Sequence, residues 1–154
     1  MNDSSPIKRR LGPLAAEWRF EAIVEGEVAV SGRTTFEWLE DAFLLQRADV
    51  DPPTADTPPE WIEHSPFPVW TVIGFDEAND RLVQLYADGR GIHRITEMTL
   101  ADGVWTLRRD APGFHTRFRG TFSADGDEIV GAFEQSPDGE SWTHDFDIRY
   151  RKVR

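Results

Sequence analysis

Four Asp-Gly pairs divide the second half of the chain into segments in which apolar and polar residues alternate. The pairs lie at 88–89, 102–103, 125–126 and 138–139. Asp-Gly readily adopts the positive φ values that tight hairpin turns require, and the alternation is typical of strands with one buried face. The sequence therefore predicts an antiparallel meander in this half of the chain.

The alternation continues upstream, and no helix of ordinary length is visible. Ten antiparallel strands with one apolar face close best into a single up-and-down barrel of the all-β class, which leaves no exposed edges. A two-sheet sandwich is the alternative. The predicted strands are 17–24, 28–39, 43–50, 69–75, 81–87, 92–100, 104–109, 114–123, 128–136 and 142–151.

The chain of 154 residues is expected to form one domain. Residues 1–10 predict a disordered tail, and residues 11–154 predict the barrel domain, which starts with a short helical turn at 11–16 that plugs one barrel end. Residues 51–68 hold six of the ten prolines and several apolar side chains, among them Trp61. Because prolines exclude a central strand while apolar side chains favour burial, this segment is a linker-like loop or a lid over a cavity, and we favour the lid.

Composition excludes several classes of function. The net charge of −11 repels phosphate groups, so nucleic acids and anionic membranes are not expected as partners. The chain has no cysteine, which excludes disulfides, thiolate catalysis and cysteine-ligated metal sites. The first residues lack the apolar segment of a signal peptide, and no apolar run is long enough to cross a membrane as a helix, so we expect a cytoplasmic protein.

The turns also predict which residues of neighbouring strands lie opposite each other, and hence which side chains share a face. The predicted opposite pairs are Leu100 with Trp105, Met98 with Leu107, Glu97 with Arg108, Phe118 with Phe133, Arg117 with Glu134, Phe133 with His144, and Gly131 with Phe146. Glu97 with Arg108 is expected to form an ion pair on the outer face. The inner face is then formed by Phe118, Phe122, Ile129, Phe133, Trp142, Phe146, Ile148 and Tyr150.

A few polar residues share the predicted inner face. Arg47 alternates with apolar residues in the third strand, Arg94 in the sixth and His144 in the last. An inward arginine keeps its charge, so it contacts the polar head of a ligand or serves as a structural or mouth-exposed residue. His144 is either hydrogen-bonded in the core or an acid–base group. The candidate ligand-binding residues are Trp38, Arg47, Arg94, Phe133, His144 and Tyr150.

No catalytic motif is visible. The chain has no Gly-rich phosphate loop, no Ser-His-Asp order and no nucleophile elbow. Glu60, Glu63 and His64 form a short acidic cluster, which without further ligands is expected to be a solvated loop rather than a metal site. The sequence therefore identifies no catalytic residue, metal or cofactor, and it leaves open whether the protein is an enzyme.

Several segments resemble a bacterial family of uncharacterised domains with a calycin-like (lipocalin-related) β-barrel. The segments are 34–47 (TTFEWLEDAFLLQR), 72–76 (VIGFD), 88–94 (DGRGIHR), 117–122 (RFRGTF) and 138–147 (DGESWTHDFD). The resemblance implies the barrel fold. Residues 143–146 are also similar to the last strand of nitrobindin, a related ten-stranded barrel that holds haem through a histidine there. In that alignment Asp145 stands at the ligating position and His144 lies one residue earlier.

These observations lead to one principal hypothesis and three alternatives. The principal one is a calycin-like barrel, a monomer or homodimer, that binds a small hydrophobic or amphipathic molecule, in one version an anion, in its interior. The first alternative is a small-molecule isomerase or cyclase that uses the same cavity. The second is a nitrobindin-like haem-binding protein. The third is an interaction module that works through the barrel edges and the proline-rich loop.

Overall fold

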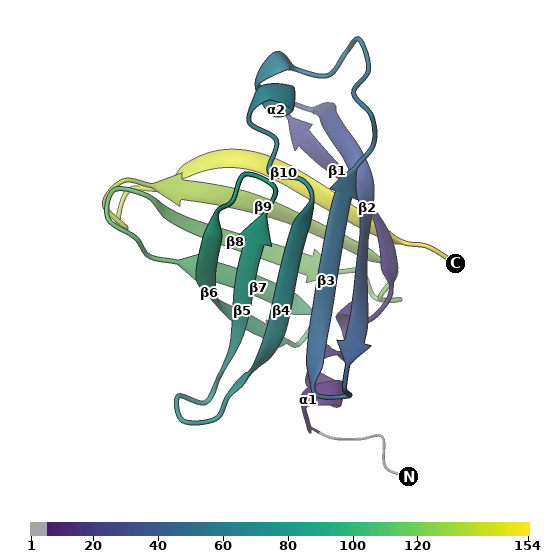
Figure 1. Ribbon diagram of the computed structural model, residues 1–154, viewed down its shortest axis with the longest axis vertical. Helices are drawn as coiled ribbons and strands as arrows, with labels where there is room; N and C mark the ends of the chain where they lie inside the picture. Colours follow the sequence, from purple (N-terminus) through teal and green to yellow (C-terminus); the bar gives the residue numbers. More distant parts are fainter. Residues whose placement is uncertain (1–5) are drawn as a thin grey trace.

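The computed structural model of the chain describes residues 6–154. Ten antiparallel strands form a closed barrel in which consecutive strands are neighbours and β1 pairs with β10 (Figure 1). This confirms the predicted all-β up-and-down barrel and excludes the two-sheet sandwich. The strands are β1 (Glu17–Val24), β2 (Glu27–Leu39), β3 (Phe43–Val50), β4 (Val69–Asp76), β5 (Arg81–Asp88), β6 (His93–Ala101), β7 (Val104–Arg109), β8 (His115–Phe122), β9 (Glu128–Ser136) and β10 (Thr143–Lys152).

Short helices lie at the two ends of the barrel (Figure 1). α1 (Pro6–Leu11) and the 3-10 turn η1 (Gly12–Leu14) pack against one end through completely buried leucines. α1 begins five residues before the predicted helical turn, and the first five residues of the predicted tail lie outside the described residues. α2 (Pro59–Glu63) belongs to the proline-rich connection and lies beyond the opposite end. None of the helices in residues 6–154 is long and apolar enough to cross a membrane.

The Asp-Gly pairs form their turns in two ways. At 102–103 both residues adopt positive φ, 53° and 75°, as a two-residue hairpin turn requires, and the glycines of the two later pairs also have positive φ. The first pair differs, because Asp88 is the buried last residue of β5 and the positive φ lies at Gly91. Gly89 instead permits a close approach, since a Cβ atom there would lie 2.7 Å from the carbonyl oxygen of Phe67. This glycine therefore docks the connection between β3 and β4 onto the barrel.

The predicted register is correct for the β6–β7 and β8–β9 hairpins, where every predicted opposite pair is found. The side chains on the outer face follow the register only in part. Arg117 Nε donates to Glu134 Oε1 at 2.7 Å, directly across the β8–β9 ladder. Glu97 lies opposite Arg108, but it forms its ion pair with Arg81 of β5, at 2.7 Å. The predicted Glu97–Arg108 ion pair is therefore wrong.

A bulge in β10 moves its pairing with β9 away from the predicted register. His144 lies opposite Glu134, while Phe146, two residues later, lies opposite Phe133. Asp145 is thus the extra residue of the bulge. Both predicted pairs across these strands are wrong, and because the bulge reverses the alternation, His144 faces outward instead of inward.

Two other side chains lie on the face opposite to the predicted one. Three residues, 40–42, form the turn between β2 and β3, so that buried Leu44 lies opposite inward-facing Trp38. The alternation then places Arg47 on the outer face, contrary to prediction. Trp142 also lies outside, with its ring centroid 4.0 Å from the guanidinium carbon of an arginine on β8.

The interior is densely filled towards the α1 end of the barrel. Aromatic rings meet there across the barrel axis, as where Trp105 of β7 packs edge-on against Phe36 of β2, with ring centroids 6.1 Å apart. This part of the barrel is a packed core rather than a cavity. The larger members of the core of the whole barrel are Leu11, Leu14, Trp18, Phe20, Phe36, Leu44, Ile73, Leu82, Met98, Trp105, Phe118, Ile129 and Tyr150.

Candidate functional site

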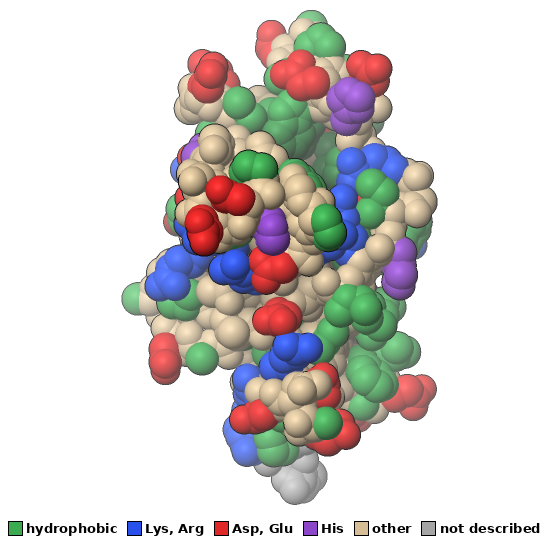
Figure 2. Space-filling view, turned by 90° about the vertical axis from the view of Figure 1, so that its left-hand side faces the viewer, with side chains coloured by type: hydrophobic (Ala, Val, Ile, Leu, Met, Phe, Trp, Pro, Cys, Tyr) green, Lys and Arg blue, Asp and Glu red, His purple; other side chains and the backbone are tan. Residues whose placement is uncertain are grey.

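The interior is open at the end beneath α2. Inward-facing positions there are half-buried rather than buried, so solvent reaches them from this end of the barrel. These positions are Arg94, Thr96, Leu107, Arg109, Thr116, Phe133, Gln135 and Phe146, on β6 to β10. Figure 2 shows a hollow below the α2 segment at the top, with apolar side chains inside it and Lys and Arg side chains on its right-hand side. We call this space the mouth.

The two walls of the interior differ in chemistry. On the β9–β10 side the wall is aromatic, with Phe133 and Phe146 stacked at a centroid distance of 4.8 Å. On the β2–β4 side it is polar, because the amide of Gln46 donates to Thr34 Oγ1 at 3.1 Å and accepts from Thr71 Oγ1 at 2.9 Å. An interior of this kind suits a molecule with both apolar and polar parts.

Arg94 of β6 supplies a positive charge at the mouth. Its guanidinium carbon lies 5.9 Å from the ring centroids of both Tyr86 and Phe114, which are cation–π distances. The guanidinium of Arg94 forms no hydrogen bond or ion pair within residues 6–154. Partial burial, and next the positive charge of Arg109, lower the pKa of Arg94 from its ordinary value.

Arg109, the last residue of β7, brings a second positive charge to the same space. It lies opposite half-buried Thr116, on the same face as Trp105 and Leu107. Its guanidinium also forms no hydrogen bond or ion pair within the described part of the chain. Two like charges in a half-buried space are unfavourable without a counterion, so the pair favours an anion between or beside them.

Asp88 holds one of the aromatic neighbours of Arg94 in place. Its carboxylate is completely buried and accepts hydrogen bonds from Tyr86 Oη at 2.7 Å and Arg90 Nη2 at 2.8 Å. The backbone N–H of Arg90 also donates to it at 2.9 Å. Burial alone would raise the pKa of Asp88, but these hydrogen bonds outweigh it and bring the pKa to about 2. Asp88 is therefore an ionised anchor for Tyr86, and Arg90 already neutralises it.

The proline-rich connection packs over the mouth through two ring contacts. Trp61 of α2 packs edge-on against Phe146 of β10 at a centroid distance of 5.1 Å, and Phe67 stacks on Phe20 of β1 at 5.5 Å. The backbone N–H of Gly89 donates to two carbonyl oxygens of the connection, each at 2.9 Å. The segment thus lies where the predicted lid would lie, fastened at its base near Gly89 and by a single ring contact at α2.

The structure places four of the six predicted ligand-binding residues inside the barrel, but only two of them at the mouth. Arg94 and Phe133 line it, as described above. Tyr150 is buried deeper, 5.7 Å from Trp105 by ring centroids. Trp38 faces inward near α1, where Lys8 Nζ lies 5.5 Å from its ring centroid. The mouth therefore gathers fewer of the predicted residues than expected.

The other two predicted residues lie on the outer face. Arg47 is exposed beside Trp70, opposite it on β4. His144 has a side chain that is 54% exposed, and its Nε2 lies 2.9 Å from Asp147 Oδ1. Neither side chain faces the interior, so the inward positions predicted for them are wrong.

The sequence prediction missed Arg109, Tyr86 and Asp88. Arg109 was detectable, because it continues the inward alternation of Trp105 and Leu107 in β7. Tyr86 follows the same alternation in β5. Asp88 was missed because Gly89 follows it. An Asp-Gly pair indicates a turn and gives no sign that the carboxylate is buried.

The residues of the interior do not fit haem ligated by a histidine inside the barrel. The side chains of His64 and His144 are 71% and 54% exposed, His93 is exposed, and His115 lies on the outer face with Nδ1 2.9 Å from Asp110 Oδ1. No histidine of residues 6–154 faces the interior. In the same part of the chain, no group of three or more His, Cys, Asp or Glu side chains is placed to hold a metal ion.

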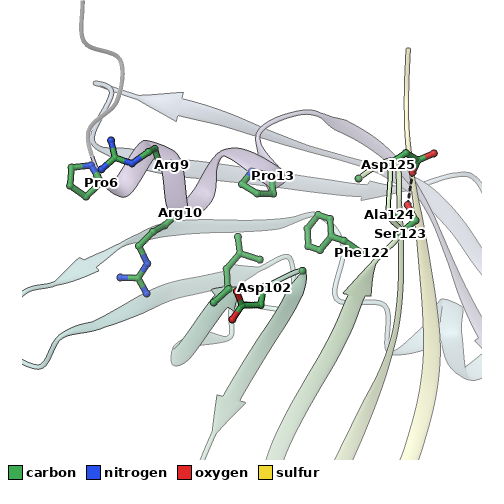
Figure 3. A pocket seen from close by; sticks show the side chains of 13 residues that line it. Pro6, Arg9, Arg10, Pro13, Asp102, Phe122, Ser123, Ala124 and Asp125 are labelled. Carbon is green, nitrogen blue, oxygen red and sulfur yellow. Dashed lines mark hydrogen bonds between the residues drawn. The ribbon is translucent and has the colours of Figure 1, made fainter.

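A second depression, of about 590 Å³, lies outside the barrel between α1 and two hairpin turns. Figure 3 shows Arg9 and Arg10 extending from α1 on one side and Asp102 and Asp125 on the turns. Ser123 Oγ donates to Asp125 Oδ1 at 2.6 Å, so these two side chains are paired with each other. Unlike the mouth, this groove presents charges of both signs, and it gives no reason to expect a particular ligand.

The fold is similar to that of a known barrel. The crystal structure of Rv2717c from M. tuberculosis matches it with a TM-score of 0.61 at 15% sequence identity, over 97% of this chain and 99% of that chain. At this identity the likeness shows the fold alone. No family model and no curated protein matches the sequence. Membership of the bacterial family therefore stays a prediction from the segments quoted above.

Proposed function

We propose that this protein is a calycin-like barrel that binds a small amphipathic anion in the mouth. One observation carries the proposal: Arg94 and Arg109 both face the half-buried mouth, and neither has a carboxylate partner within residues 6–154. In a chain of net charge −11, carboxylates are abundant, so two unneutralised arginines at one place favour a ligand as their counterion. The charge also supports the expectation that nucleic acids and anionic membranes are not partners.

The two parts of such a ligand have separate places in the mouth. A guanidinium presents a planar set of N–H donors that matches a carboxylate, sulfonate or phosphate group, so the anionic head belongs beside Arg94 and Arg109. The apolar part belongs on Phe133 and Phe146, with Trp61 above it. Entry requires Trp61 to leave Phe146, which makes the connection at 51–68 a lid in this proposal. A cytoplasmic location and a monomeric or homodimeric state belong to the same proposal.

Fluorescence titration with 8-anilinonaphthalene-1-sulfonate, an aromatic anion, tests the proposal. Arg94→Met and Arg109→Met should each weaken binding by about tenfold or more, because each removes a charge-assisted hydrogen bond in a half-buried space. Arg47→Met is the matched control, since it makes the same change on the outer face and should alter the affinity less than about twofold. Equal effects of all three substitutions, or no binding by the wild type, would overturn the proposal.

A further inference from the structure

Two inward-facing side chains, Gln84 and Trp105, have a buried polar atom without a partner among the described residues, and Gln84 is the one near the mouth. Gln84 of β5 is 5% exposed, its Oε1 is buried, and its amide forms no hydrogen bond within the described residues. Gln46 on β3 is a direct contrast, because its amide uses both Thr34 and Thr71 as partners. A buried amide without partners is unfavourable, and such a group requires an explanation.

Gln84 lies directly below the charged part of the mouth. On the β5–β6 ladder, Tyr86 lies opposite Arg94 and Gln84 lies opposite Thr96. Two residues along a strand span about 6.6 Å, so Gln84 lies about 6.6 Å further into the barrel than the Tyr86–Arg94 pair. Thr96 is half-buried and lines the mouth, which means that the space above Gln84 is continuous with it. The next inward step, Leu82 opposite Met98, is buried and apolar.

A trapped water molecule alone is a poor partner for this amide. A buried water needs two to four polar partners. Among the inner-face neighbours of Gln84, Leu82 and, on β4, Ile73 are apolar, and the hydroxyl group of Tyr86 already donates to Asp88. Thr96, opposite Gln84 on β6, adds a polar group, and its hydroxyl forms no hydrogen bond within residues 6–154. Gln84 and Thr96 therefore lie opposite each other with unused hydrogen-bonding capacity.

We infer that the ligand of the mouth is a hydroxylated organic acid whose hydroxyl group lies about 7 Å from its anionic head and hydrogen-bonds Gln84. A hydroxyl group can donate to the amide oxygen and accept from the amide nitrogen or from Thr96, so it satisfies a primary amide in either orientation. Leu82 and Met98, which lie next below Gln84, are apolar, so no polar group of the ligand is expected beyond its hydroxyl group. This inference rests on the proposed function, because it places the anionic head beside Arg94.

Two matched acids test the inference by isothermal titration calorimetry: 4-hydroxycinnamate and cinnamate, which differ by one distant hydroxyl group. Wild-type protein should bind the hydroxylated acid about tenfold more tightly, because sites built to hydrogen-bond a hydroxyl group discriminate against analogues that lack it. In Gln84→Leu the ratio should fall to about one while cinnamate still binds. Arg94→Met should weaken both acids and leave the ratio unchanged.

A stability measurement keeps the test decisive if a variant binds weakly. Gln84→Leu should raise the thermal midpoint of the ligand-free protein, since it removes a buried amide without partners. Gln46→Leu, the same change at a partnered glutamine, should lower it. A ratio near one in the wild type, with Arg94 still needed for both acids, would overturn this inference and leave the proposed function intact. Absence of binding by either acid, together with no effect of Arg94→Met on the sulfonate probe, would overturn both.

Discussion

Replacing Asp88 with asparagine should remove a pH dependence of stability that arises from a single buried carboxylate. In the folded protein the Asp88 side chain is completely buried, and donors on Tyr86 and Arg90 surround it. Asparagine keeps an oxygen that can accept from Tyr86, but it has no charge to lose. The difference between the two proteins therefore isolates the ionisation of this one group.

The sign and size of the effect follow from the pKa of Asp88. It is about 2 in the folded protein, against about 3.9 for an aspartate in an unfolded chain. A group whose pKa is lower in the folded state stabilises that state above the unfolded pKa, and this contribution is lost as the pH falls towards the folded pKa. At 1.36 kcal/mol per unit of pKa difference, the contribution is about 2.6 kcal/mol, and it is lost progressively between roughly pH 5 and pH 1.

Urea unfolding at a series of pH values from 7 to 2 measures this contribution. The free energy of unfolding of the wild type should exceed that of Asp88→Asn at neutral pH, and the gap should shrink by about 2 kcal/mol on acidification to pH 2. Asp56→Asn, at an exposed carboxylate in the long connection, corrects for the loss of one negative charge. A gap that stays constant from pH 7 to pH 2 would refute the assignment of Asp88 as an ionised anchor.

Two further predictions concern the fold. Leu11→Ala should lower the free energy of unfolding by about 2–5 kcal/mol in urea titration, because it opens a cavity where α1 meets the barrel; a loss below about 1 kcal/mol would contradict the packing of α1. Deletion of Asp145 should leave a folded barrel, because it removes only the extra residue of the bulge and keeps its neighbours on their faces. Deletion of Arg149 should abolish the cooperative unfolding transition, since it moves one side of β10 to the opposite face. Circular dichroism melts distinguish the two, and equal tolerance of both deletions would contradict the bulge.

The strands were predictable from the sequence because their turns carry distinctive residues, whereas the face of β3 was not. Phe43, Leu44 and Leu45 are all apolar, so the alternation allows either face to be the inner one. The inner face of β3 is set by the three-residue turn before it, which places Leu44 opposite Trp38. In this turn Glu40 and Asp41 both have a φ of 54°. A Glu-Asp pair does not indicate such a turn in a sequence, whereas an Asp-Gly pair does. The misplacement of Arg47 follows from this ambiguity.

The bulge in β10 had the same kind of consequence. His144 and Phe146 are two residues apart, so regular alternation places them on one face. Asp145 interrupts the alternation, and nothing in the local sequence marks it as the extra residue. A single unpaired residue thus moved the histidine that supported the haem hypothesis to the outside. Predictions drawn from alternation hold only as far as the ladder is regular.

The arginines of the two faces explain why the binding proposal rests on charge rather than on shape. On the outer face, Arg81 and Arg117 have carboxylates at 2.7 Å, and Arg47, which has no carboxylate partner within the described residues, is exposed to water. Arg94 and Arg109 have no carboxylate partner within the described residues, and they are half-buried rather than exposed to water. They are also close enough for the positive charge of Arg109 to lower the pKa of Arg94. The nearest buried acid, Asp88, is already neutralised by Arg90. The proposed anion in the mouth would be the counterion that this arrangement lacks, and it would explain the position of both arginines at once.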